Sequence, residues 1–370
     1  MSINKMILTA GPSITEKEIS YVTDAVTNGW NENWSGYLNE FESEIERYIS
    51  VEHAMATSSC TGALHLGLLA LGIGPGDEVI VPEITWVATA SAVTYVGAKP
   101  VFCDIKEGAW CLDLNSAESL ITSKTKAIFP VHLYGHPADM PAVMSLAEKY
   151  DLYVIEDAAP SIGAEVADKK TGSFGDVAGF SFQGAKILST GEGGMFLTNN
   201  ERLFERVKFL GDHGRDPSKP LAAIEVGYKY KMSNLQAALG LAQLERVDEL
   251  VDRKREINKQ YRDNLIGKAS IKVSNEEPGC KSNHWMTSVE IDGLDYVGRD
   301  YVMSELKKRL VDSRPVFSPM SMLPMFDKSG DNPVAYRIGQ SAINLPSGHN
   351  LTSEEIDYVS EVLLEVVRKC

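Results

Sequence analysis

Lys186 has the sequence surroundings of a reactive amine. It follows the strand-like run Phe180–Phe182 and precedes the glycine-rich turn Gly191-Glu192-Gly193-Gly194. A lysine between a buried strand and such a turn is partly desolvated, which lowers its pKa and makes the amine nucleophilic. Most lysines are simply solvated at a surface, so only this context singles out Lys186.

Three further segments end or follow strand-like runs. Asp157 ends VIED and could fix a positively charged ring nitrogen, although such residues often cap the next helix. The run TSSCTG (57–62) precedes an apolar helix, where free N–H groups and the helix dipole would hold a phosphate; an ordinary N-cap is the alternative. Trp86 could stack on a flat heterocycle, although core packing is the commoner fate of a tryptophan.

Together these segments supply a phosphate cradle, an aromatic face, an acid for a pyridinium and an amine for an imine. Pyridoxal 5'-phosphate (PLP) requires that set, because it withdraws electrons when its ring nitrogen is protonated and its aldehyde is held by a lysine. Open α/β sheets place ligands at strand ends, where all four segments fall. The residues therefore indicate a PLP site.

The elements that must position these residues alternate between strand and helix patterns. The predicted strands are the runs HAMAT, EVIVP, KPVFCDI, KAIFPVHLY, DLYVIED, VAGFSF and GGMFLTN. The predicted helices cover 15–27, 62–71, 141–150, 201–210, 234–265, 300–311 and 353–368, with two β-like runs, SIKVS and HWMTSVEI, after residue 268. This pattern predicts an α/β protein with a large domain over 1–245 and a connecting helix and small α+β domain over 246–370.

Composition excludes several classes of protein. The 370 residues are 44% hydrophobic and 24% charged, which is ordinary for a globular chain. A net charge of −15 opposes a general role on nucleic acid or anionic membrane. Five scattered cysteines without a C-x-x-C pair indicate neither a disulfide framework nor a zinc site. No signal peptide or membrane span is visible, so we expect a soluble cytoplasmic protein.

Several motifs together resemble one family. EVIVPEITWVATASAV, VIEDAAPSIGA, SFQGAKILSTGEGGMFLTN and MSNLQAALGLAQLERVDEL are similar, in content and order, to motifs of the DegT/DnrJ/EryC1/StrS family of PLP-dependent nucleotide-sugar aminotransferases. The resemblance covers nearly the whole chain, including SRPVFSPM and NLPSG near its end. It implies the fold-type I aminotransferase architecture: a three-layer αβα large domain with a mostly parallel seven-stranded sheet, and a small α+β C-terminal domain. It also implies a homodimer with shared active sites, or a tetramer.

The resemblance gives roles to individual residues. It implies that Lys186 is the catalytic Schiff-base lysine, that Asp157 pairs with the pyridine nitrogen, and that Trp86 stacks on the ring. Ser181 matches the phosphate-binding serine, and Arg314 of SRPVFSPM is expected to bind substrate.

Some positions depart from the family pattern. Cys60 and Thr61 stand where members usually have Gly-Thr, and Cys60 can offer its N–H to the phosphate only if the turn does not require a positive φ. Pro160 stands where many members carry Gln or Glu beside the ring. Lys229 and Lys231 stand where Asn and Arg are common; we expect Lys229 to reach the neighbouring subunit's phosphate as a point charge, and Lys231 to bind substrate.

The implied reaction is a ping-pong transfer of an amino group from glutamate to the C-4 ketone of a nucleotide-linked 4-keto-6-deoxyhexose, for surface glycans such as O-antigen. Amination at C-3 shares every cofactor motif and stays open. The family's sugar dehydratases replace the lysine by histidine, so Lys186 argues against dehydration. A non-catalytic, regulatory PLP-binding protein is a remoter alternative.

The sequence gives weaker support for a metal site or for other kinds of active site. His132 and His136 lie four residues apart, but Tyr134-Gly135 between them opposes a helix and no third ligand is adjacent, so no metal is expected. The G-x-G-x-x-G dinucleotide motif and the G-x-S-x-G esterase motif are absent from the sequence.

Overall fold

A computed structural model describes residues 4–219, 221–328 and 330–370 of the chain. Residues 53–198 supply a seven-stranded sheet with the order β1-β9-β8-β5-β4-β2-β3. Its strands are β1 (His53–Thr57), β2 (Glu78–Pro82), β3 (Lys99–Cys103), β4 (Thr125–Ile128), β5 (Tyr153–Asp157), β8 (Val177–Ser181) and β9 (Gly194–Thr198). β9 runs antiparallel to both β1 and β8, whereas β8, β5, β4, β2 and β3 run parallel to one another. The sheet is therefore mostly parallel, as predicted.

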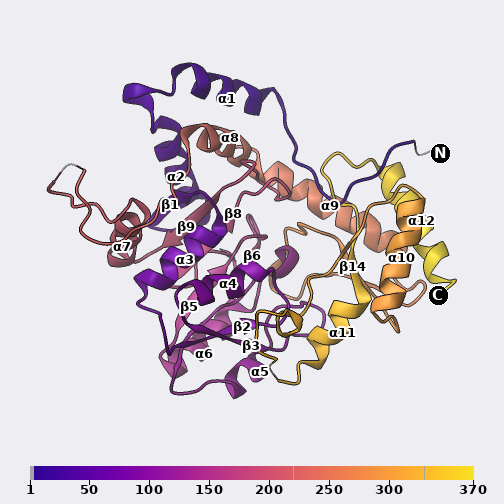
Figure 1. The fold of residues 1–370 in the computed structure, drawn as a ribbon. Coiled ribbons are helices and arrows are strands. Elements are labelled where there is room, and N and C mark those ends of the chain that lie inside the picture. The colour runs from indigo at the N-terminus through magenta and orange to yellow at the C-terminus, as the bar shows by residue number, and fades with distance from the viewer. Residues whose placement is uncertain (1–3, 220, 329) are drawn as a thin grey trace.

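Helices cover both faces of this sheet (Figure 1). One face packs in a single core cluster with α3 (Cys60–Ala70), α4 (Val87–Tyr95) and α7 (Glu201–Gly211). The other face packs with α2 (Gly36–Ile49), α8 (Asn234–Leu244) and α9 (Val247–Leu265). Towards β3, the same face packs with α6 (Met140–Tyr150) and α5 (Leu114–Ser119). Because successive strand residues face opposite sides, Val79 and Val81 pack with the first set of helices and Ile80 with the second. Helix, sheet and helix form three layers.

A second sheet follows α9, which runs from the first sheet towards it in Figure 1. Its order is β10-β12-β14-β13, with β10 (Ile271–Val273), β12 (Ser288–Ile291), β14 (Ala342–Asn344) and β13 (Arg314–Pro315). The helices of this part of the chain are α10 (Tyr296–Lys308), α11 (Pro333–Ser341) and α12 (Ser353–Val367). β11 (Cys280–Lys281) pairs with β6 (Glu165–Val166), and β6 with β7 (Lys169–Lys170), so a small sheet joins the two halves of the chain.

The N-terminal segment crosses to this second sheet. Ile7 forms a bridge with Val311, and the Thr9 carbonyl accepts a hydrogen bond of 2.9 Å from Ser347 N. α1 (Glu16–Asn28) then returns to the first sheet, where it packs on α8. It begins with the predicted capping box of Thr15 and Glu18. Three 3-10 turns, at Asn31–Asn33, Leu133–Gly135 and Met320–Met322, complete the elements of the described residues.

Three sequence-based expectations about these elements were wrong. The single helix predicted over 234–265 is two helices, since the chain bends at Arg246, whose guanidinium reaches back to Glu18 at 2.7 Å. The helix predicted from residue 300 begins at Tyr296, because Asp295 caps it by accepting from Gly298 N. The run HWMTSVEI is a strand only in its second half. The division into domains 1–245 and 246–370 stays a prediction.

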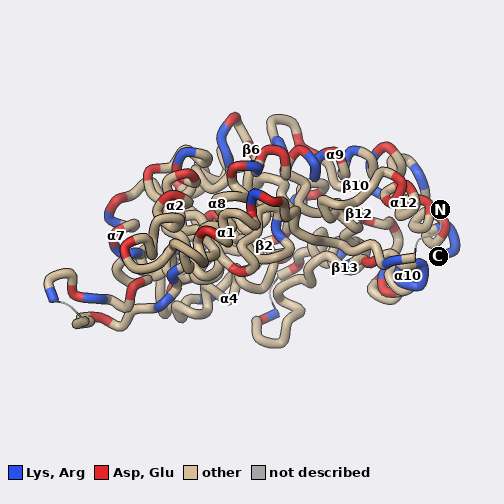
Figure 2. Tube along the Cα trace, turned by 90° about the horizontal axis from the view of Figure 1, so that it is seen from above, with Lys and Arg blue, Asp and Glu red and all other residues tan. Residues whose placement is uncertain are grey.

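The positions of positively and negatively charged residues are interspersed along the chain trace (Figure 2). Within the described residues no helix is long and apolar enough to cross a membrane. All five cysteines carry free thiols.

Candidate active site

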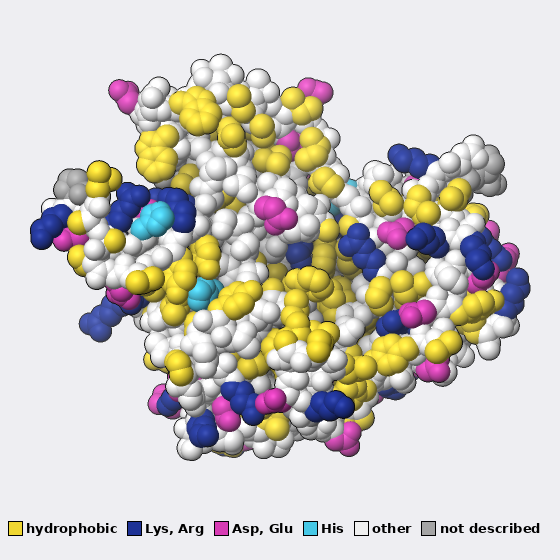
Figure 3. Space-filling model, viewed as in Figure 1, with side chains coloured by type: hydrophobic (Ala, Val, Ile, Leu, Met, Phe, Trp, Pro, Cys, Tyr) yellow, Lys and Arg dark blue, Asp and Glu magenta, His cyan; other side chains and the backbone are white. Residues whose placement is uncertain are grey.

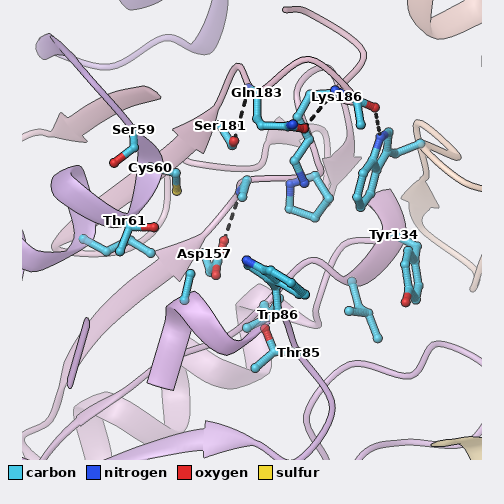
Figure 4. A pocket seen from close by; sticks show the side chains of 18 of the residues that line it. Ser59, Cys60, Thr61, Thr85, Trp86, Tyr134, Asp157, Ser181, Gln183 and Lys186 are labelled. Atoms are coloured by element: carbon cyan, nitrogen blue, oxygen red, sulfur yellow. Dashed lines mark hydrogen bonds between the residues drawn. The ribbon is translucent and has the colours of Figure 1, made fainter. Parts of the chain in front are cut away.

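A cavity of ≈ 420 Å³ opens at the carboxyl ends of β5 and β8 and at the start of α3. Seven residues predicted for the site share its lining: Cys60, Thr61, Trp86, Asp157, Ser181, Lys186 and Arg314. Figure 4 shows Asp157 beside Trp86, with Ser181 and Lys186 across from them. Segments far apart in the sequence thus meet where an open α/β sheet places its ligand.

The N-terminus of α3 has the geometry of an anion cradle. Ser59 is the N-cap, and its hydroxyl accepts from Gly62 N at 3.1 Å. Within the described residues, the N–H groups of Cys60 and Thr61 have no protein acceptor, so both are free to donate to a phosphate. Cys60 begins the right-handed helix and is not among the residues with positive φ, so the departure from glycine costs no backbone strain.

Gly194 makes room for this cradle. A Cβ at this first residue of β9 would lie 2.3 Å from Cys60 N and 2.5 Å from the Ser59 carbonyl carbon, closer than van der Waals contact permits. The start of α3 therefore rests directly on the backbone of β9.

Asp157 is held by a chain of hydroxyl groups. Its Oδ2 accepts from Thr89 Oγ1 at 2.6 Å, and Thr89 Oγ1 lies 2.8 Å from Thr85 Oγ1. Because the Thr89 proton points to the carboxylate, Thr85 must donate to Thr89. The other oxygen accepts from Ala159 N at 3.1 Å. Asp157 is only 5% exposed, and its carboxylate is oriented before any ligand binds.

Lys186 lines the cavity opposite this carboxylate. Burial lowers the pKa of its amine to about 8, and Asp157 and Cys60 oppose part of that effect. Among the described residues it makes no ion pair and no side-chain hydrogen bond; its Nζ lies 3.5 Å from the centre of the Trp285 ring. An amine of lowered pKa without a polar partner is suited to nucleophilic chemistry.

Aromatic rings form the wall nearest the second sheet. The Trp86 side chain is 60% exposed and lies 5.5 Å, centre to centre, from Phe317. Phe317 in turn stacks on Tyr134 at 5.1 Å, and Tyr134 on Trp285 at 5.9 Å. Trp86 is thus available to stack on a ligand rather than packed in the core.

Gly135, with φ +94°, shapes this wall as well. A Cβ there would lie 1.7 Å from Asn283 Oδ1, which accepts from Trp285 N at 2.9 Å. Asn283 Nδ2 donates to the Pro160 and Ile162 carbonyls, so this one amide joins the segment before β12 to the segment after β5. Pro160 itself lines the cavity without a polar side chain.

Lys229 and Lys231 lie outside this cavity. Thr57 and Lys231 form an antiparallel bridge at the edge of the first sheet, and both lysine amines approach Asp212, at 3.5 and 3.8 Å. Arg215 lies 3.9 Å from the same carboxylate. Lys231 lines a separate groove between α2 and α7. Their predicted roles therefore require a ligand from outside this subunit's own cavity.

The sequence did not point to Thr89, Tyr134, Trp285 or Phe317. Thr89 lies one helical turn after Thr85 on a strand-to-helix junction, a spacing that could have marked it. The aromatic residues reach the cavity only through the tertiary fold, so no local pattern identifies them.

The two histidines weighed as metal ligands have other partners. His132 Nδ1 accepts from Ala138 N at 3.0 Å, and its Nε2 lies 3.0 Å from Glu156 Oε2. His136 Nδ1 lies 2.8 Å from the Pro137 carbonyl, and its Nε2 accepts from Glu277 N at 3.1 Å. Both nitrogens of each ring are therefore engaged with the protein.

Comparison with known proteins gives consistent matches. A model of the DegT/DnrJ/EryC1/StrS aminotransferase family matches residues 12–364. The chain is 39% identical to GDP-perosamine synthase from Escherichia coli O157:H7 over 96% of both proteins. It is 41% identical to GDP-perosamine synthase from Caulobacter vibrioides, over 99% of this chain and 100% of that protein.

Solved structures show the same likeness. The putative sugar aminotransferase Spr1654 from Streptococcus pneumoniae, in its PLP form, is 30% identical with a TM-score of 0.93, covering 98% of this chain and 99% of that one. Its PMP form, also 30% identical, gives a TM-score of 0.93 over 98% of both chains. The fold-type I architecture and the PLP cofactor predicted from the sequence are confirmed.

Proposed function

The chain belongs to the DegT/DnrJ/EryC1/StrS aminotransferase family, and on that premise we propose that it transfers an amino group from glutamate to the C-4 ketone of a nucleotide-linked 4-keto-6-deoxyhexose. The observation that carries the proposal is the Lys186 amine, without a polar partner among the described residues, in one cavity with Asp157. The two GDP-perosamine synthases support the choice of sugar and of a GDP carrier. The product would serve surface glycans such as O-antigen.

The cavity fits PLP. When bound, PLP supplies an electron sink that stabilises negative charge on the carbon next to the transferred nitrogen. The free N–H groups of Cys60 and Thr61 and the Ser181 hydroxyl would hold its phosphate, Asp157 its ring nitrogen and Trp86 its ring face. Lys186 would hold its aldehyde carbon. We assign Arg314, which lines the same cavity, to substrate binding.

Proton transfer follows from the placement of Lys186. Its free Nζ takes the proton from the α-carbon of glutamate in one half-reaction, and delivers a proton to the sugar carbon that receives the amine in the other. A pKa near 8 serves both directions, because neither the amine nor the ammonium dominates completely near neutral pH. A histidine at this position, as in dehydratases, would lack the aliphatic amine, so we propose amination rather than dehydration. Amination at C-3 instead of C-4 is the second candidate.

We also propose that the working unit is a homodimer, or a dimer of dimers, with shared active sites. Lys229 and Lys231 do not line this subunit's cavity. Together with Arg215 they surround the single carboxylate of Asp212, so the group keeps a net positive charge that can bind an incoming anion. Exposed apolar side chains also gather over α1 and the segment after it, at the top of Figure 3: Ile19, Val26, Trp30 and Trp34 are 51–57% exposed. A second copy would cover such a surface. The five free thiols support a reducing compartment, and we place the enzyme in the cytoplasm.

One experiment tests the reaction. The protein is incubated with PLP, isotopically labelled glutamate and, in separate samples, GDP-, UDP- and dTDP-linked 4-keto-6-deoxy sugars, and products are identified by mass spectrometry and NMR. We expect labelled nitrogen at C-4, best with the GDP sugar, and none with Lys186→Ala. Nitrogen at C-3 would favour the second candidate. A dehydrated product, or no product with any sugar, would contradict amination.

A further inference from the structure

Trp285, from the C-terminal part of the chain, contacts Lys186. It lies in the irregular segment before β12, is 8% exposed and lines the cavity. Its indole N–H donates to the Ala185 carbonyl at 2.7 Å, and the Lys186 Nζ lies 3.5 Å from its ring centre. One side chain therefore holds both the backbone before Lys186 and the amine of Lys186.

Trp285 is itself firmly placed. Its backbone N–H donates to Asn283 Oδ1, and its ring stacks on Tyr134 with 25° between the planes. His284, just before it, has φ +47°, a conformation that non-glycine residues rarely adopt and that turns the chain towards the cavity. The indole is thus fixed by packing and hydrogen bonds that do not involve Lys186.

The face of an indole ring attracts a cation, and more strongly where water is scarce. Around the Lys186 amine the charged or titratable groups are Asp157 from β5 and Cys60 from α3. Tyr134, Glu192 and Arg314 also line the cavity. None of them makes an ion pair with Lys186 within the described part of the chain. The indole face, 3.5 Å from Nζ, is therefore in direct contact with the amine and can stabilise a free ammonium.

We propose that Trp285 is a positioning residue for Lys186: its N–H fixes the Ala185 carbonyl, and its ring face holds the Lys186 ammonium whenever the amine is not bound to the cofactor. The second part rests on the proposed function, since only transamination releases this amine in each half-reaction. The ring keeps the released ammonium inside the cavity instead of letting it extend towards solvent, so the amine is in place to return its proton.

Competitive labelling tests the proposal on the full chain freed of PLP. The rate at which acetic anhydride acetylates Lys186 is followed against pH by mass spectrometry of the Lys186 peptide. For the native chain we expect an inflection near 8. In Trp285→Leu the inflection should fall by about 0.5–1 pH unit, because the ammonium loses its ring face. Trp285→Phe keeps a ring and should fall less.

The direction of the change separates positioning from simple burial. If Trp285 only kept water away from Lys186, its removal would hydrate the ammonium and raise the inflection. A rise or an unchanged inflection in Trp285→Leu, with folding confirmed by circular dichroism, would overturn the proposal. Trp110→Phe, which alters another buried indole, is the matched control and should leave the inflection unchanged.

A second readout tests the hydrogen bond. Trp285→Phe lacks the indole N–H, so the segment carrying Lys186 is less restrained and PLP should dissociate several-fold faster from the holoenzyme, as followed by its absorbance. An unchanged dissociation rate would show that the indole N–H does not help to hold the segment that carries Lys186. The labelling uses neither glutamate nor sugar, so it gives its answer even if the proposed transamination fails.

Discussion

The orientation of a single carboxylate depends on two threonine hydroxyls. Asp157 must present a lone pair to a ring nitrogen, and the Thr85-to-Thr89 hydrogen bond leaves Thr89 only one role, donation to Asp157 Oδ2. Because Asp157 is buried, little water competes for its carboxylate, and the hydrogen bond from Thr89 is correspondingly stronger.

We predict that Thr89→Val slows the glutamate half-reaction by about 10- to 100-fold, because a hydrogen bond to a charged group contributes about 1.5–3 kcal/mol. Valine has nearly the shape of threonine, so the packing of α4 is retained. Stopped-flow absorbance with glutamate measures the rate, and Thr89→Ser should restore most of it. Thr94→Val, an exposed site on the same helix, is the control. A native rate in Thr89→Val would show that Asp157 needs no hydroxyl support.

At this scale the sequence identified the residues that local chemistry singles out. Asp157 ends a recognisable strand and Lys186 follows one, so their shared edge could be predicted, whereas Ser181 was assigned through the family resemblance. Trp285 could not, because its segment is far away in the sequence and was expected to be a regular strand. Only the fold shows that it turns away from β12 to reach Lys186.

Elements position the site through close backbone contacts. The phosphate cradle depends on α3 lying directly against β9, and Gly194 is the residue that permits this approach. The strands and α3 were predictable from apolar runs, but a contact between two backbones leaves no pattern in either segment. The break between α8 and α9 was unpredictable for a similar reason, since Arg246 bends towards a partner in α1.

We therefore predict that Gly194→Ala weakens PLP binding at least 10-fold. The added methyl group must displace the start of α3, and the N–H groups of Cys60 and Thr61 move with it. Equilibrium dialysis gives the dissociation constant, and pyridoxal without its phosphate should bind the variant and the native chain alike. An equal loss of pyridoxal binding would show that the substitution damages a part of the site other than the phosphate cradle. Gly11→Ala, where a Cβ meets nothing within 4 Å and the φ is not positive, provides a control for a glycine far from the cradle.

A buried lysine on α9 makes stability depend on pH. Lys254 is 2% exposed, donates to the Ser347 carbonyl and has its pKa lowered to about 7 by burial. Between about pH 7 and the unfolded pKa near 10.4, unfolding takes up a proton, so this residue makes stability rise with pH across that window.

We predict that Lys254→Met removes this rise, which is at most about 1.4 kcal/mol per pH unit. Urea unfolding at several pH values from 7 to 10 measures it, as the difference in slope between variant and native chain. Lys259→Met, on an exposed part of the same helix, should keep the native slope. If the two variants show equal slopes, the Lys254 amine is charged in the folded chain.

At the scale of the whole molecule, the proposal that two copies share each active site rests on two lysines outside the cavity. Lys229 and Lys231 hold their charge on the surface beside the β1 edge, in a chain of net charge −15. Local positive charge of this kind is what an acidic protein needs in order to bind a phosphate or a nucleotide diphosphate.

We predict that two inactive variants restore activity when mixed. Lys186→Ala and Lys229→Glu chains exchange subunits, and each heterodimer then has one site with an intact Lys186 and an intact Lys229 from the neighbour, while the other site has both defects. Activity should approach one quarter of the native value in an equimolar mixture at random pairing, which follows from half the dimers carrying one good site of two. No recovery, with exchange confirmed by native mass spectrometry, would mean that Lys229 serves its own subunit.

The bridge between Ile7 and Val311 also sets an order of events during synthesis. The ribosome exposes residue 7 long before residue 311, so the first strand-like segment of the chain has no partner while the seven-stranded sheet is being made. Trp285, Arg314 and Phe317 emerge in the same late stretch, and they close the wall of the cavity. Nascent chains that stop before this point lack the residues that close this wall beside Lys186, and their N-terminal segment lacks its bridge partner Val311. We therefore expect a newborn chain to be most open to chemical modification at the Lys186 amine, and to mispairing near Ile7, until the segment from Trp285 to Phe317 has left the ribosome.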